Sequence, residues 1–312
     1  MHPIFARTFN AAYRHSFSVF GNPNEWFDFH DAIKLLLAIY VLLALNVSNA
    51  FGSIVLMKFE ADRTIVAADS RQHQESWTDD SVCKIIEIDP HIFFFATGRA
   101  IMTDPSNHRK ELWSSFSTAR SAISDYSDIR GYGFVRFIST WAEMMRELYE
   151  NVLIRDRQHL VSALKDPGIS IGVFGRSDEN GVRVYLVSIR YALPPEVSGP
   201  MVYWITREIH AGELPVFTFG DPTAFGLTTE FLADKTPRAK AANRAFRRQF
   251  ASSSPDIDAQ KLRAAIEAAI KWIPDKRIIG GSVDLMTVRK GGVIEWHNRK
   301  SECGTDHGAP NH

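Results

Sequence analysis

Short runs of β-branched and aromatic residues, separated by turn residues, predict strands in the chain after residue 52. Ser53–Phe59 and Thr64–Ala68 flank a four-residue polar connection, and Cys83–Ile88 and His91–Ala96 flank Asp89-Pro90. Strands of this length joined by such short connections are typical of β-hairpins. We therefore expect two antiparallel hairpins in this region.

A helical periodicity replaces the strand pattern further along the chain. Apolar residues recur there at intervals of three and four positions, namely Phe134, Phe137, Ile138, Trp141, Met145, Leu148 and Val152. This spacing places them on one face of a long helix. An earlier helix is expected across Arg109–Ser124, so that the two form an antiparallel helical pair.

Strand and helix patterns alternate again in the remaining sequence. Strands are expected at Gly168–Phe174, Val182–Ile189, Met201–Glu208, Val216–Phe219, Ser282–Val288 and Val293–His297, and helices at Pro237–Phe250 and Ile257–Trp272. An Asn180-Gly181 pair between the first two strands indicates a tight hairpin turn. The order strands, two helices, strands, two helices, strands lets two sheets stack with helices over both outer faces. The predicted fold class is therefore α+β, as a four-layer α/β/β/α sandwich.

The first 52 residues have a different pattern, which predicts a leader. The apolar run from Leu35 to Leu45 is too short to span a bilayer comfortably and matches a signal-peptide core of ~7–15 residues. Small residues follow it in two cleavage frames, one of which releases Phe51 and the other Ser53. We expect a leader over 1–52, a domain over 53–299 and a polar tail over 300–312, in an exported, periplasmic or extracellular protein. Because more than thirty residues precede the run, an uncleaved membrane anchor and a buried core helix are alternative interpretations.

The composition is that of a globular protein and excludes several classes of function. Of the 312 residues, 45% are hydrophobic and 23% are charged, and 36 basic residues balance 36 acidic ones. With no net charge, the chain has no global attraction for nucleic acid. Two cysteines can form at most one disulfide, and neither they nor the eleven histidines show the spacing of a metal site. We predict no metal, no cofactor and no nucleic-acid partner.

Four motifs occur in an order that carries a family resemblance. They are Ala67-Ala68-Asp69-Ser70-Arg71 within Gly52–Arg71, Val82-Cys83-Lys84-Ile85-Ile86-Glu87-Ile88, Ala96-Thr97-Gly98-Arg99, and Gly280-Gly281-Ser282-Val283-Asp284-Leu285. Together they resemble motifs of the proteasome-type β subunits and their bacterial relatives, which are N-terminal nucleophile (Ntn) hydrolases. The resemblance covers most of residues 52–298.

The resemblance implies a hydrolytic site that uses the free end of the chain. Ser53, freed by removal of the leader, would supply the nucleophilic hydroxyl, and its α-amine, with an ordinary pKa near ~7.7–8.0, would accept the proton. Lys84 would favour the alkoxide-like state of that hydroxyl, and Asp69 would keep Lys84 charged and oriented. Backbone N–H groups of Thr97 and Gly98 would face the oxyanion. The implied substrate is a peptide or an amide.

Departures from the family pattern leave other functions open. Serine stands at position 53 where threonine is usual, Ile279 stands where the family has serine, and an alternative register would place Gly52 at the nucleophile position. A second hypothesis is therefore a catalytically silent proteasome-like protein that acts in assembly, as a homo-oligomer, or in partner binding. A third is a membrane-anchored binding protein, whose contact with the membrane would run only through the uncleaved leader.

Overall fold

The computed structural model describes residues 53–74, 77–80, 82–104, 107–124, 132–155, 168–192, 201–233, 237, 240–241, 244, 257–273, 279–300 and 303. All of them belong to one compact unit, Ala50–His312. The predicted leader over 1–52 lies outside the described residues, so its cleavage stays a prediction. No helix in the described part of the chain is long and apolar enough to cross a membrane.

One of the two main sheets contains the chain's first hairpin and its last. Its strand order is β12-β1-β2-β13-β14, and all of its neighbouring strands are antiparallel. The bounds are β1 Ile54–Phe59, β2 Arg63–Asp69, β12 Phe217–Gly220, β13 Val283–Arg289 and β14 Ile294–Asn298. The predicted β1–β2 and β13–β14 hairpins are thereby confirmed.

The second main sheet has the order β11-β10-β9-β6-β5 and is also antiparallel throughout. Its strands are β5 Ile85–Asp89, β6 Ile92–Gly98, β9 Gly168–Asp178, β10 Gly181–Ala192 and β11 Met201–Ile209. Gly181 has a φ of 144° in the turn between β9 and β10, a conformation that side-chain-bearing residues rarely adopt. The Asn180-Gly181 hairpin is confirmed.

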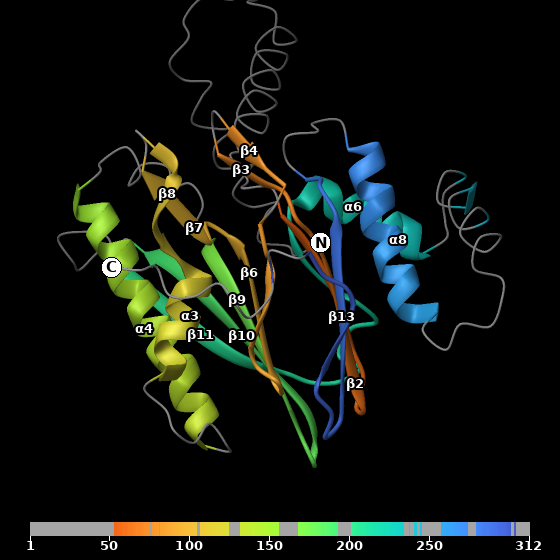
Figure 1. Cartoon of the computed structure of the whole chain (residues 1–312), viewed down its shortest axis with the longest axis horizontal. Coiled ribbons are helices and arrows are strands. Elements are labelled where there is room, and N and C mark those ends of the chain that lie inside the picture. The colour runs from red at the N-terminus through yellow and green to blue at the C-terminus, as the bar shows by residue number, and fades with distance from the viewer. Residues whose placement is uncertain are drawn as a thin grey trace, which may run out of the picture. The chain divides into compact units, whose positions relative to one another are not determined.

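An apolar core joins the two sheets to each other. Alternate residues of β1 and β2, such as Val55 and Val66, pack with Phe93, Phe95 and Val173 of the second sheet. Strand side chains alternate between faces, so the residues between them point to the opposite side of each sheet. Figure 1 shows β9 and β10 on one side and β2 and β13 on the other.

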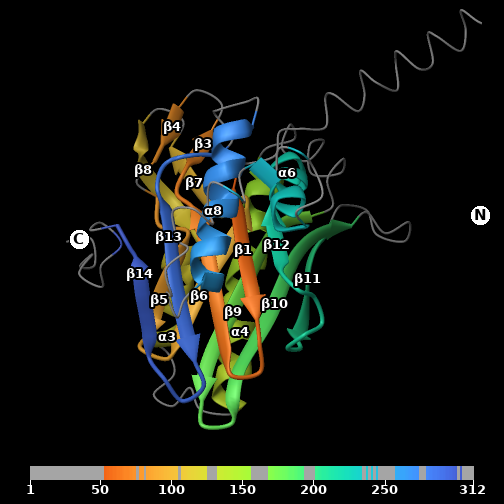
Figure 2. The same cartoon turned by 90° about the vertical axis from the view of Figure 1, so that its right-hand side faces the viewer.

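Helices pack on the sheets (Figure 2). Helices α3 Ser115–Ser124 and α4 Tyr132–Arg155 share a core with the second sheet, and α6 Pro222–Ala233 and α8 Ile257–Trp272 share one with the first. The predicted stripe of α4 is buried at Phe134, Phe137, Ile138, Trp141 and Met145. The sequence-based bounds of α8 are confirmed.

The predicted fold class, a four-layer α/β/β/α sandwich, is wrong. The residues that the structure describes are mostly in antiparallel β-sheets, with 46% of them in strands, and they form four helices. One reason lies at Arg109–Ser124, which we expected to be wholly helical. Strand β8 Asn107–Ser114 occupies its first part and pairs with β7 Ile101–Asp104, and α3 begins at Ser115.

Two further helical segments differ from expectation. Helix α6 was not predicted, although Asp221 and Pro222 are a common start signal, and the Asp221 carboxylate accepts a hydrogen bond from the Ala224 N–H at 3.1 Å. Of the predicted helix Pro237–Phe250, residues 237, 240, 241 and 244 are described and are helical. The remainder of that range lies outside the described residues.

Candidate active site

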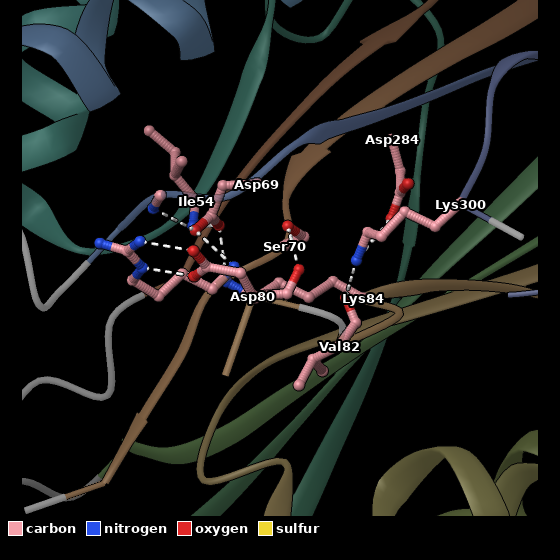
Figure 3. Close-up of polar contacts among 10 residues, drawn as sticks. Ile54, Asp69, Ser70, Asp80, Val82, Lys84, Asp284 and Lys300 are labelled. Carbon is pink, nitrogen blue, oxygen red and sulfur yellow. Dashed lines mark hydrogen bonds and ion pairs between the residues drawn. The ribbon is translucent and has the colours of Figure 1, made fainter. Parts of the chain in front are cut away.

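Asp69 is the residue on which the candidate site converges (Figure 3). It ends β2 and is completely buried. Its Oδ1 accepts hydrogen bonds from the Ile54 N–H at 2.8 Å and from Lys84 Nζ at 2.6 Å. Its Oδ2 accepts from the backbone N–H groups of Gly280 at 3.1 Å and Arg71 at 3.3 Å. Four donors therefore hold this carboxylate in one orientation.

Lys84 reaches Asp69 from the other sheet. It directly precedes β5, and its side chain is 4% exposed. Burial lowers the pKa of Lys84, and the Asp69 carboxylate opposes that change by attracting the ammonium. A lysine whose pKa is lowered by burial releases its proton more readily than a lysine in water.

Ser53 lies beside this pair through the chain itself, because it precedes Ile54, whose N–H donates to Asp69. The backbone of Ser53 is held by the residue after β12, since its carbonyl oxygen accepts from the Asp221 N–H at 2.8 Å. At Gly220, with a φ of 111°, an added Cβ would lie 1.7 Å from the same oxygen. Glycine is therefore required where β12 approaches Ser53.

Thr97 and Gly98, the predicted oxyanion residues, end strand β6. Thr97 is buried, and its carbonyl oxygen accepts from the Ser170 hydroxyl at 3.3 Å. Gly98 has a φ of 81°, and its carbonyl oxygen accepts from the Ala100 N–H. These contacts involve carbonyl groups, so the role of the two N–H groups as oxyanion donors stays a prediction.

A second charge pair holds the loop next to Asp69. The Arg71 guanidinium binds Asp80 through two hydrogen bonds, of 2.5 Å and 2.6 Å, and this contact holds the pKa of Asp80 below its ordinary value. The Ser70 hydroxyl donates to the Asp80 carbonyl oxygen at 2.7 Å. Both Ser70 and Arg71 donate their backbone N–H groups to the Gly280 carbonyl oxygen. The Ala-Ala-Asp-Ser-Arg motif and the Gly-Gly motif thus meet in space.

Sequence reasoning missed a group of residues that contact the segment before Lys84 or one another. They are Asp284 on β13, Lys300 after β14, and a disulfide between Cys83 and Cys303. Asp284 stood within a recognised motif, and two cysteines allowed one bridge, but no spacing in the sequence relates Lys300 to Lys84.

The described residues contain no group of three or more histidine, cysteine, aspartate or glutamate side chains that could hold a metal ion. No protein-family model matches the sequence, and a search of curated proteins found no significant match. The functional argument therefore rests on the site's own geometry.

Proposed function

We propose that the chain is an Ntn-type amidohydrolase or peptidase that uses Ser53, freed by removal of the leader, as its nucleophile. The observation that carries the proposal is the buried Lys84–Asp69 pair, whose carboxylate is also bonded to the N–H of Ile54. A charged pair of this kind is costly to bury unless it is fully hydrogen-bonded, and groups with a shifted pKa cluster at functional sites. The proposal depends on this site and not on the fold class.

The proposed reaction needs only the Ser53 hydroxyl, its α-amine and a water molecule to transfer every proton. The free α-amine of Ser53 accepts the hydroxyl proton while Oγ forms a bond to the carbonyl carbon of the substrate amide. The C–N bond then breaks, and the protonated amine returns its proton to the leaving amine. Water attacks the remaining ester by the same route and regenerates the hydroxyl. The Lys84 ammonium stabilises negative charge on Oγ, and Asp69 keeps that ammonium in place.

Export is part of this proposal, because the leader would direct the chain out of the cytoplasm and its removal would release Ser53. The Cys83–Cys303 disulfide supports it, since disulfides persist in oxidising compartments and are rare in the cytosol.

A silent protein of the same family type is the second candidate function, and Ile279 favours it. Ile279 is fully buried in the apolar cluster with Ala265 and Ile266, at the position where the resembling pattern has serine. An apolar side chain cannot orient the amine of Ser53. Such a protein would assemble with itself or bind a partner protein, without hydrolysis.

The test begins with the mature N-terminus of the native protein, read by N-terminal sequencing and intact mass. We expect Ser53 as the first residue. The purified protein is then treated with an electrophile selective for N-terminal hydroxyl nucleophiles, and we expect one label on Ser53. In Ser53→Ala the label is lost, whereas Ser121→Ala, which removes an exposed hydroxyl of α3, keeps it.

The outcomes separate the candidates. Ser53 as first residue without labelling supports the silent protein, and recovery of Met1 as first residue contradicts the hydrolase.

A further inference from the structure

Lys300 lies next to the segment that carries Lys84 (Figure 3). It follows β14, and its side chain is 11% exposed. Its ammonium donates a hydrogen bond to the carbonyl oxygen of Val82 at 2.5 Å and lies 3.7 Å from Asp284 Oδ2. Lys300 therefore binds the backbone two residues before Lys84 and pairs with a carboxylate of β13.

The residue between Val82 and Lys84 is held by the same C-terminal segment. Cys83 forms a disulfide with Cys303, and the Cys303 N–H donates to the Lys300 carbonyl oxygen at 3.0 Å. Lys300 and Cys303 thus bind two consecutive residues, Val82 and Cys83. The backbone that leads into Lys84 has little freedom to move.

Charged groups around Lys84 also affect its pKa. Among the described residues, acidic groups that interact with its ammonium include Asp69, Asp80 and Asp284, and Lys300 is a basic group that does so. Burial is the main cause that lowers the pKa of Lys84, and the positive charge of Lys300 lowers it further. Asp284 is 1% exposed, and the interactions of Lys300 with its carboxylate oppose the rise in pKa that burial causes. The ion pair with Lys300 therefore offsets part of the cost of burying the Asp284 carboxylate.

We propose that Lys300 is a positioning residue for Lys84, which it holds in place through Val82 and Asp284. The inference rests on the proposed function, because it is the proposed role of Lys84 that gives this placement a consequence. Lys300 does not contact the reacting atoms. It fixes the direction from which the Lys84 side chain approaches Asp69, and it adds a like charge that weakens the hold of Lys84 on its proton.

The experiment compares Lys300→Met with the conservative Lys300→Arg and with a matched control, Lys290→Met. Lys290 lies in the exposed turn between β13 and β14, where the loss of one ammonium should have no effect on the site. Two quantities are measured for each protein. The first is the rate of electrophile labelling at Ser53 across pH, and the second is the titration of Lys84, followed by NMR of protein with isotope-labelled lysine side chains.

We expect Lys300→Met to slow labelling by roughly tenfold or more, because small displacements of a catalytic group have effects of that size or larger. The Lys84 titration should move to higher pH, since a neighbouring positive charge has been removed. The alkaline fall in labelling should move with it. Lys300→Arg should restore both quantities toward wild type, and Lys290→Met should leave both unchanged.

Lys300→Met leaves Asp284 buried without its counter-charge and is open to misfolding. The double variant Lys300→Met/Asp284→Asn removes both charges together and is the second test. Because Lys300 acts more strongly on Lys84 than Asp284 does, the Lys84 titration should still move to higher pH, by a smaller amount.

An unchanged Lys84 titration in the folded variants overturns the proposal, whatever the labelling rate does. A loss of thermal stability with no change in that titration means that Lys300 is merely structural. The proposed function fails separately, if wild type with a free Ser53 is never labelled. In that case a shifted Lys84 titration still supports the positioning role.

Discussion

At the scale of single residues, the carboxylate of Asp69 is the group whose surroundings are most completely specified. Three backbone N–H groups and one ammonium donate to its two oxygens, in a fully buried position. Each of the two oxygens therefore accepts two hydrogen bonds. A neutral side chain of the same shape cannot replace it, because an amide offers one acceptor oxygen and turns two N–H donors toward groups that are themselves donors.

Asp69→Asn is therefore expected to destabilise the protein and to abolish labelling of Ser53. Removal of one partner from a buried ion pair costs about 3–5 kcal/mol, since it leaves the other charge uncompensated. Adding Lys84→Met removes that charge, so the double variant should recover part of the free energy of unfolding and none of the labelling. Urea denaturation measures the first quantity. An Asp69→Asn protein as stable as wild type would contradict this account of the pair.

Asp284 predicts a pH dependence of stability. Burial raises its pKa above the ordinary value of 3.8, with Lys300 opposing. The folded protein then holds this proton more tightly than the unfolded chain does. The corresponding stability is fully present below about pH 3.8 and is lost as pH rises through the raised pKa.

Asp284→Asn removes this dependence, so the variant should gain stability relative to wild type between about pH 4.5 and pH 7. Urea denaturation at the two pH values gives the comparison. Glu179→Gln, in the exposed turn between β9 and β10, is the matched control and should show no such gain. A constant difference between Asp284→Asn and wild type at both pH values would show that Asp284 titrates normally.

At the scale of elements, strand β9 brings the second sheet close to helix α4. A Cβ added at Gly172 would lie 2.4 Å from the ring of Trp141 and 3.1 Å from that of Phe94. Trp141 is fully buried, and its Nε1 donates to the Ser115 carbonyl oxygen at 3.0 Å. The indole therefore fills the space that the glycine leaves, and it ties α4 to the start of α3.

Gly172→Ala should lower the free energy of unfolding by about 1–3 kcal/mol, as overpacking of a core typically does. Combined with Trp141→Phe, which makes room for the methyl group, it should cost less than the sum of the two single changes. The control is Gly226→Ala in α6, where nothing lies within 4 Å of the added atom. That substitution should be neutral or slightly stabilising. Strict additivity of Gly172→Ala and Trp141→Phe in a double-mutant cycle would argue against the contact.

The elements that the sequence predicted well are those with a strong period and a clear boundary. Short β-rich runs on either side of a polar connection identified the β1–β2 hairpin, and a three-and-four spacing identified α4. Strand β8 was mistaken for helix because its pairing with β7 outweighs the local pattern of Asn107–Ser114. Among site residues, Asp69 and Lys84 were expected as a pair, whereas Lys300 could not have been, since its distance from Lys84 in sequence carries no signal.

At the scale of the whole molecule, contacts at the sheet edges join the two sheets in addition to the core between them. The Ile294 N–H of β14 donates to the Pro90 carbonyl oxygen at 2.9 Å, and Trp296 Nε1 donates to Glu87 of β5 at 3.0 Å. The Cys83–Cys303 disulfide adds a covalent link between residues 220 positions apart. The chain segment just before β5 is thus tied to the one just after β14.

A disulfide that closes so long a loop strongly restricts the unfolded chain. A bridge across a loop of this length is expected to stabilise the folded protein by about 3–5 kcal/mol. Cys83→Ser/Cys303→Ser should therefore lower the free energy of unfolding by that amount, measured by urea denaturation without reductant. Added reductant should destabilise wild type toward the double variant and leave the double variant unchanged, which controls for other effects of the reagent. If reductant converts both cysteines of wild type to free thiols without lowering its stability, the link contributes nothing to the fold. Lys300 and Cys303 would then still be held by the Lys300–Val82 and Cys303–Lys300 hydrogen bonds and by the Lys300–Asp284 ion pair.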